Sequence, residues 1–108
     1  MKTLQTLGNL MIDNKDLADS YNWDEAQKQI ELLNSQNYKD FNDWRLPTKK
    51  ELNLMYLNKE DISGFANVYY WSSSKYGDNY AWIQGFGNGC QDNANKSFTA
   101  YIRAVRTI

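Results

Sequence analysis

The spacing of apolar residues changes near Ser63-Gly64 and divides the chain into two parts. Before this point apolar residues recur every three or four positions, a spacing typical of amphipathic helices. After it, aromatic and small residues replace the Leu, Lys and Glu of the first part and alternate with polar residues, which is the period of a strand. The sequence therefore predicts helices in the first part and a sheet in the second.

Two capping boxes mark the predicted helix starts. The first pairs Asn22 with Glu25, and the second, directly after the only proline of the chain, pairs Thr48 with Glu51. We expect the second helix to end near Asn58. Each box is followed by an apolar stripe at helical spacing: Trp23, Ala26, Ile30 and Leu33 in the first helix, and Leu52, Met55 and Tyr56 in the second.

Four segments carry strand signals: 7–12, 68–73, 80–86 and 98–106. In the third segment, alternation places Trp82, Gln84 and Phe86 on one face. Ile83 and Gly85 then lie on the other. We expect Trp82 and Phe86 to face the core.

Composition excludes several classes of function. The 108 residues predict one domain, 1–108, and the net charge of -1 gives no broad basic field for nucleic acid. The chain has no histidine and one cysteine, so the usual zinc ligands and the Ser-His-Asp and Cys-His catalytic sets are missing. No apolar run approaches the roughly 20 residues that cross a bilayer, and no signal peptide is recognisable at the start. We expect no metal, cofactor or membrane insertion.

All three arginines lie in two short motifs, 43–48 and 101–106, whereas nine lysines are scattered elsewhere. A guanidinium can satisfy several buried acceptors at once and stack on a tryptophan face. We therefore expect the two motifs to anchor the fold together with the tryptophans. The predicted structural residues are Trp23, Trp44, Arg45, Glu51, Trp71, Trp82, Arg103 and Arg106.

The polar segment 72–96 mixes Ser, Gly, Asn, Asp, Gln and Tyr. This composition is typical of adaptable binding surfaces, but the sequences at 77–79 and 87–89 are also ordinary hairpin turns. Both interpretations remain open. If the segment binds a ligand, the candidate residues are Tyr76, Asp78, Asn79, Tyr80, Ile83, Asn88, Gln91, Asp92 and Asn93.

Taken together, the motifs resemble the Lcl C-terminal domain family from about residue 8 to residue 106. They are Trp23 with Glu25-Ala26, 43–48 with Glu51-Leu52, 70–73, Ala81-Trp82 with Phe86 and Gly89, 95–97, and 101–103 with Val105-Arg106. The resemblance implies an α+β, C-type lectin-like fold, with two helices packed on a twisted, mainly antiparallel sheet and long irregular loops on one side. It also implies ligand recognition at a bacterial surface, in a secreted protein or in a phage virion. Some relatives are variable receptor-binding proteins of diversity-generating retroelements.

Two departures from the family pattern carry information. Family members commonly have cysteines where this chain has Ile30 and Ala104. The missing disulfide is compatible with a reducing compartment and weakens the expectation of secretion. Gln84 stands where the pattern favours an inward apolar residue, so it is either satisfied in a network or drawn to an open face, since an unsatisfied buried amide costs roughly 1–3 kcal/mol.

Three functions remain as hypotheses. The first is a non-enzymatic domain that recognises a protein or glycan. The second is a structural or oligomerisation module of a phage fibre or adhesin, which would form a homo-oligomer. The third is a small enzyme related to formylglycine-generating enzymes, although their chemistry needs paired cysteines and Cys90 is alone. Calcium dependence is not expected, because Asp78, Asp92, Asn93 and Asn95 supply oxygens but the motifs of calcium-dependent lectins are absent.

Overall fold

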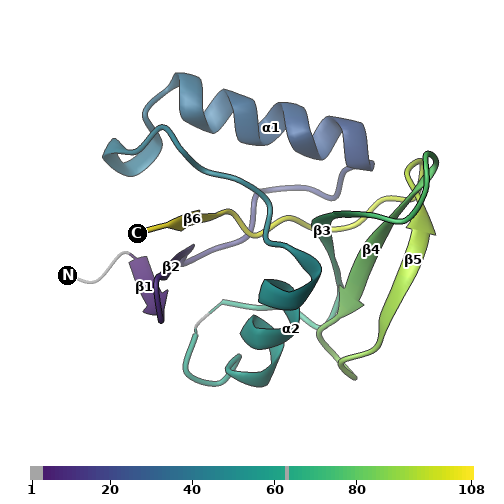
Figure 1. The fold of residues 1–108 in the computed structure, drawn as a ribbon. Coiled ribbons are helices and arrows are strands. Elements are labelled where there is room, and N and C mark those ends of the chain that lie inside the picture. Colours follow the sequence, from purple (N-terminus) through teal and green to yellow (C-terminus); the bar gives the residue numbers. More distant parts are fainter. Residues whose placement is uncertain (1–3, 63) are drawn as a thin grey trace.

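The chain folds into two helices and two antiparallel three-stranded sheets, which confirms the α+β class (Figure 1). This computed structural model describes residues 4–62 and 64–108. The sheets have strand orders β1-β2-β6 and β3-β4-β5, so two small sheets replace the single sheet that was expected. The elements are β1 (Leu4–Leu7), β2 (Leu10–Asp13), α1 (Trp23–Ser35), a 3₁₀ turn (Tyr38–Asp40), α2 (Lys49–Leu57), β3 (Tyr69–Lys75), β4 (Tyr80–Gly85), β5 (Gln91–Asn95) and β6 (Val105–Thr107).

The first sheet joins the two ends of the chain. The strand predicted over 7–12 is confirmed for residues 10–12, which belong to β2, but it is interrupted because the chain turns back at Gly8-Asn9 and forms the β1–β2 hairpin. Gly8 has a φ of 63°, a left-handed conformation that suits a two-residue turn. β2 then pairs with β6, with Ile12 opposite Val105.

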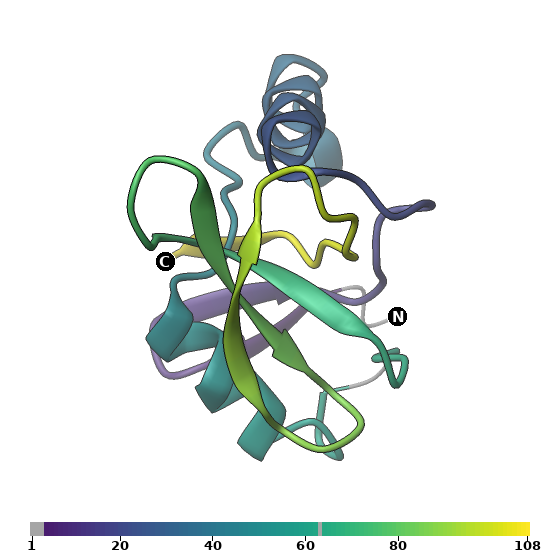
Figure 2. The same ribbon diagram turned by 90° about the vertical axis from the view of Figure 1, so that its right-hand side faces the viewer.

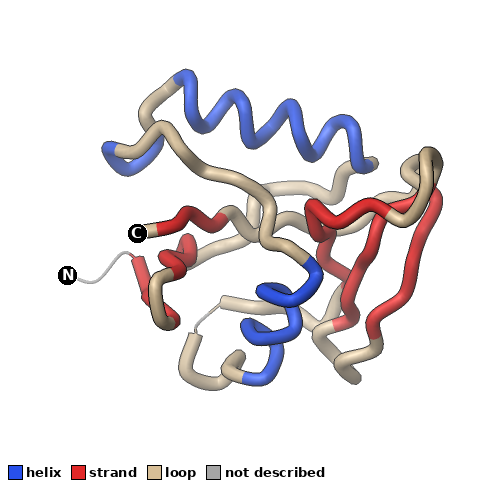
Figure 3. Tube along the Cα trace, viewed as in Figure 1, coloured by secondary structure: helices blue, strands red, loops and turns tan. Residues whose placement is uncertain are grey.

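The second sheet contains an unexpected strand and lacks an expected one. β5 pairs residue for residue with β4, from Tyr80 opposite Asn95 to Gln84 opposite Gln91, although Asn, Asp and Gln are weak strand formers. In contrast, most of the predicted strand 98–106 is loop (Figure 3). It is held by isolated bridges: Tyr21 to Ala100, Tyr70 to Tyr101 and Arg45 to Val105.

Both predicted helices form, and both capping boxes are present. In α1, Asn22 Oδ1 accepts from the Glu25 N–H at 2.9 Å, and Glu25 Oε1 accepts from the Asn22 N–H at 3.2 Å. In α2, Thr48 Oγ1 accepts from the Glu51 N–H at 3.1 Å, and Glu51 Oε1 accepts from the Thr48 N–H at 2.9 Å. α2 is capped at Asn58, the predicted end.

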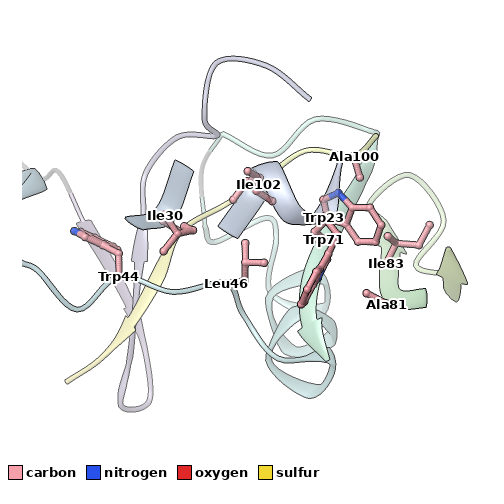
Figure 4. Close-up of a cluster of buried hydrophobic side chains, with 11 residues drawn as sticks. Trp23, Ile30, Trp44, Leu46, Trp71, Ala81, Ile83, Ala100 and Ile102 are labelled. Atoms are coloured by element: carbon pink, nitrogen blue, oxygen red, sulfur yellow. The ribbon is translucent and has the colours of Figure 1, made fainter. Parts of the chain in front are cut away.

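One core cluster lies between α1 and the β3-β4-β5 sheet (Figure 4). Trp23, Trp44 and Trp71 are buried in it, and each indole N–H donates to a backbone carbonyl: those of Ser72, Tyr38 and Tyr21 respectively. Ile30 and Ala104 are also buried in this cluster. Apolar packing therefore occupies the positions where family members commonly have cysteines.

A second cluster lies under α2 and contains Leu52, Met55, Tyr70 and Phe86, together with Ile12 and Val105. Phe86 faces the core as predicted, but Trp82 is only half-buried. Lys49 Nζ lies 3.6 Å from the centroid of the Trp82 ring. A lysine side chain at the start of α2 therefore covers this ring in place of apolar core residues.

Arg103 makes hydrogen bonds and a contact with an aromatic ring. Arg103 is fully buried; its Nε donates to Asp16 Oδ1 at 2.9 Å and its Nη1 to the Asp13 carbonyl at 3.0 Å. Its guanidinium lies 4.1 Å from the Phe65 ring. The predicted stacking on tryptophan is therefore wrong for this residue, because Phe65 is the aromatic side chain that its position reaches.

The other two arginines form bidentate pairs. Arg106 donates to Asp43 at 2.6 and 3.1 Å and lies 3.8 Å from the Phe41 ring, again not on a tryptophan. Arg45 donates to both carboxylate oxygens of Glu51, at 2.7 and 2.9 Å. Glu51 thus serves the α2 capping box and this ion pair at once.

We predict that Thr48→Ala lowers the free energy of unfolding by about 1 kcal/mol, since it removes the side-chain cap of α2. Urea unfolding measures the change. Thr99→Ala is the matched control, because Thr99 is exposed and lies outside both helices. Equal stability of the two variants would contradict the role of the cap.

We further predict that the contribution of Glu51 depends on pH. Hydrogen bonds from Arg45 lower the pKa of the Glu51 carboxyl below its ordinary value, although burial opposes the shift. A lowered folded-state pKa means that the stabilisation is complete above the ordinary value of about 4.3 and is lost as pH falls through the folded-state pKa. Glu51→Gln should therefore destabilise the protein at pH 7 and much less at pH 2.5, as measured by urea unfolding. Glu31→Gln, at an exposed position of α1, should show no such difference.

Candidate ligand-binding site

The predicted ligand-binding residues do not form one surface. Tyr76, Asp78, Asn79 and Tyr80 lie at the β3–β4 turn, whereas Asn88 lies at the β4–β5 turn. Consecutive hairpin turns of an antiparallel sheet lie at opposite ends, and Figure 2 shows these two turns at opposite ends of the β3-β4-β5 sheet. The expectation of a single loop face is therefore corrected.

Gln91 is half-buried and faces α2. Its Nε2 donates to the Lys49 carbonyl at 2.9 Å and to Gln84 Oε1 at 3.2 Å. Gln84 is fully buried, and its own Nε2 donates to Asn53 Oδ1 and to the Gly89 carbonyl. The Gln84 amide is thus hydrogen-bonded within a network, which was the first of the two alternatives. Gln91 faces α2, where its amide donates to the Lys49 carbonyl and to Gln84.

The opposite face of the same strands is hollowed. Strand alternation places Ile83 and its partner Asp92 on the face away from Gln84 and Gln91. A hollow of about 490 Å³ opens there. Its lining residues are Tyr69, Ile83, Asp92, Asn93, Ala94, Asn95, Ser97 and Phe98. We call this the main hollow because it is the larger of the two beside Tyr69; it includes three of the predicted ligand-binding residues, Ile83, Asp92 and Asn93.

Two exposed aromatic side chains line the main hollow. Tyr69 is 41% exposed and Phe98 is 43% exposed, and their rings meet edge to face with centroids 6.3 Å apart. Ile83 is only 5% exposed, so it forms the apolar base. The hollow therefore combines an apolar base and aromatic sides with polar side chains.

Hydrogen bonds among the lining residues hold the polar side chains in place. Asp92 Oδ1 accepts from the Asn93 N–H at 2.8 Å. Asn95 Oδ1 accepts from the N–H and the hydroxyl of Ser97, at 2.9 and 2.8 Å.

A smaller hollow of about 200 Å³ lies on the other side of Tyr69. It is lined by Asn67, Val68, Tyr69, Gly85, Gly87 and Asn88, so it includes a fourth predicted residue. Gly85 makes the close packing here possible. A Cβ at Gly85 would lie 3.1 Å from Tyr69 Cε1 and 3.1 Å from Asn88 Oδ1.

The β3–β4 turn forms a separate exposed surface. Tyr76 is 54% exposed and its ring contacts Trp82 edge to face, with centroids 5.4 Å apart. Lys96 ties the turn to the loop after β5, since its Nζ donates to the Asp78 carbonyl at 2.8 Å and its N–H to the Asn79 carbonyl at 2.9 Å.

Two further findings concern metal ligands and membrane spans in the described part of the chain. Residues 4–62 and 64–108 contain no group of three or more His, Cys, Asp or Glu that could hold a metal ion. Within the same residues no helix has the length and hydropathy of a membrane span. Cys90 is an exposed free thiol.

The family model of the Lcl C-terminal domain matches residues 5–106. The chain belongs to this family. The match confirms the resemblance predicted from the motifs and covers nearly the whole domain. Comparison with curated proteins found no match.

In this Lcl C-terminal domain, sequence reasoning missed Tyr69 and Phe98 as site residues. A signal for Tyr69 existed in the run Tyr69-Tyr70-Trp71, because the middle residue of three in a strand must face opposite to its neighbours. Tyr70 is buried under α2, so Tyr69 points to the other face. No comparable signal marks Phe98, since the chain there is loop.

Proposed function

We propose that this Lcl C-terminal domain is a non-enzymatic recognition module that binds a protein or glycan ligand in the main hollow. The observation that carries the proposal is the pair of aromatic side chains, Tyr69 and Phe98, each about two-fifths exposed beside a hollow with a buried apolar base. Exposed aromatic surface joined to a few convergent polar groups is typical of ligand sites.

Most residues that line the main hollow lie on strands and are therefore preorganised, whereas Ser97 and Phe98 lie in the loop after β5. Tyr69 lies on β3 and Ile83 lies on β4. Residues 70–72 of β3 and 83–85 of β4 are buried. A ligand that binds the strand residues does not have to order them, so less of the binding free energy is lost to conformational entropy. Recognition by a rigid surface is the use that this geometry favours.

The lining residues also favour binding over catalysis. Asp92 is the one carboxylate among those that line the two hollows, and the chain has no histidine to act as its partner in acid–base chemistry. Cys90, the residue on which the enzyme hypothesis rests, does not line either hollow. We extend the proposal to a C-type lectin-like receptor-binding role on a bacterial surface or phage virion, based on the family resemblance alone.

The proposal is tested by comparing Tyr69→Ala with Tyr76→Ala. Ligands are identified by titrating ¹⁵N-labelled protein with oligosaccharides and short peptides, and the affinities of the variants are then measured by calorimetry. We expect shift changes around Tyr69, Asp92 and Phe98, and a loss of at least tenfold in affinity for Tyr69→Ala with little change in melting temperature. Tyr76→Ala should bind normally. Shift changes confined to the β3–β4 turn would refute the proposed site.

A second candidate, an assembly module, is favoured by one observation. Tyr76 and Tyr80 are 54% and 41% exposed at the β3–β4 turn, a surface that a second subunit could cover. If this candidate is right, sedimentation velocity will show an oligomer that Tyr76→Ala with Tyr80→Ala converts to monomer. A monomer at all concentrations up to the millimolar range would eliminate it.

A further inference from the structure

We infer that the outer edge of β5 binds an extended segment of a partner protein, which adds a strand to the β3-β4-β5 sheet and places an apolar and a basic side chain in the main hollow. The inference rests on the proposed recognition function and names the class of ligand. It is derived from the open backbone groups of β5, from the position of the main hollow and from the charge of its lining.

The β3-β4-β5 sheet has one covered edge and one open edge. β3 is covered, because the Trp71 N–H donates to the Tyr101 carbonyl at 3.0 Å and the Tyr101 N–H donates to the Tyr69 carbonyl at 2.9 Å. β5 lies at the other side of the sheet and, within the described residues, pairs with β4 alone (Figure 1). Its residues, Gln91–Asn95, include neither proline nor lysine, which commonly protect an exposed edge.

The ladder with β4 determines which backbone groups of β5 point outward. The Gly85 N–H donates to the Cys90 carbonyl at 2.9 Å, and the Lys96 N–H donates to the Asn79 carbonyl at 2.9 Å. Hydrogen-bonded and non-bonded pairs alternate along an antiparallel ladder. Every second residue of β5, beginning with Gln91, therefore directs its N–H and C=O groups away from β4.

Most of these outward groups are open. Within the described part of the chain, no hydrogen bond is made by the N–H and C=O of Gln91, the C=O of Asn93 or the N–H of Asn95. The Asn93 N–H donates to Asp92 Oδ1 at 2.8 Å, and the Asn95 carbonyl accepts from the Phe98 N–H at 2.8 Å. An antiparallel peptide can therefore bond to β5 at each open group without displacing an existing hydrogen bond, which is the way in which peptides extend a sheet.

A second copy of the chain fits this edge less well than a peptide. Two β5 strands paired about Asn93 would need both Asn93 N–H groups, which Asp92 holds, and both Asn95 carbonyls, which Phe98 holds. The bonds from each Asn95 N–H to the Gln91 carbonyl of the other copy are the ones that remain. We therefore assign the edge to a peptide whose own backbone groups are all open.

The main hollow lies beside this edge. Residues 92–95 of β5 all line it, and consecutive strand residues face opposite sides, so the hollow reaches the backbone of β5. Side chains of paired strands lie next to each other on the same face. The peptide residue opposite Ala94 therefore points into the hollow, where Ile83 forms the base and Phe98 is 43% exposed. We expect this peptide residue to be apolar.

The peptide residue opposite Asp92 should be basic. Asp92 is exposed and is the one formally charged residue among those that line the main hollow. Opposite charges directly across a strand pair attract, whereas like charges repel. Because the added strand is antiparallel, the ligand pattern from the N- to the C-terminus is an apolar residue, any residue and a basic residue.

The test uses capped hexapeptides of sequence Thr-Phe-Thr-Lys-Thr-Val, and versions with leucine, isoleucine or tryptophan in place of the phenylalanine. We expect at least one to shift the amide resonances of Gln91, Asn93 and Phe98 in ¹⁵N-labelled protein. Replacing its lysine with glutamate should weaken binding about fivefold. Asp92→Lys should reverse this preference, and the control Asp24→Lys, at an exposed position of α1, should keep it.

N-methylation of the peptide distinguishes strand addition from other modes of binding. A methyl group on the nitrogen of the threonine before the lysine removes the bond to the Asn93 carbonyl. A methyl group on the nitrogen of the threonine after the lysine removes the bond to the Gln91 carbonyl. Each should weaken binding at least tenfold. Methyl groups on the nitrogens of the lysine or of the apolar residue point away from β5 and should leave the affinity unchanged.

Several outcomes would overturn strand addition but leave the recognition function intact. They are equal effects of N-methylation at all four positions, binding of oligosaccharides but of no peptide in the main hollow, and a dimer in sedimentation velocity whose formation shifts the Gln91 and Asn95 resonances. Absence of binding by every hexapeptide at millimolar concentration would also overturn it. Shift changes confined to the β3–β4 turn would remove both the strand addition and the proposed function.

Discussion

The buried guanidinium of Arg103 is the contact on which the rest of the structure depends. It connects the C-terminal segment to the last residue of β2, through the Asp13 carbonyl, and to the chain after β2, through the Asp16 carboxylate, some 90 positions away in sequence. Asp16 Oδ2 in turn accepts from the Tyr70 hydroxyl at 2.7 Å, which brings β3 into the same network. Removing one partner of a buried charge pair costs about 3–5 kcal/mol, so this network fixes the position of β3.

The position of β3 determines the candidate site. The Tyr70 side chain is held inward by Asp16 and by the rings of Phe65 and Phe86. Because successive strand residues face opposite sides, an inward Tyr70 fixes Tyr69 on the outer face. Tyr70, which belongs to the anchoring network, and Tyr69, which belongs to the candidate site, are thus consecutive residues of one strand and lie on its two opposite faces.

The helices could be predicted from sequence because their signals are local. A capping box of four residues marks the start of each helix: Asn22 with Glu25, and Thr48 with Glu51. Strand pairing is not local: β5 is polar and has a strand conformation because β4 offers it a partner, and only the register shows that its Asp92 faces the main hollow. The sequence identified four residues that line the two hollows, but it could not show that the two turns lie at opposite ends of the sheet.

The two faces of β4 explain how a binding surface can coexist with a small core. Toward α2, the buried Gln84 uses its amide to join β5, α2 and the Gly89 turn, so polar contacts on this face add to the backbone ladder that holds β5. On the other face, Ala81 and Ile83 are buried with Trp71 in the cluster beside α1, and Ala94 of β5 packs against the same cluster. The exposed side chains of Asp92 and Asn95 lie outside this cluster. Substitutions at Asp92 or Asn95 would leave the Gln84 network and the Arg103 network untouched. The side chains at these two positions can therefore change at little cost in stability.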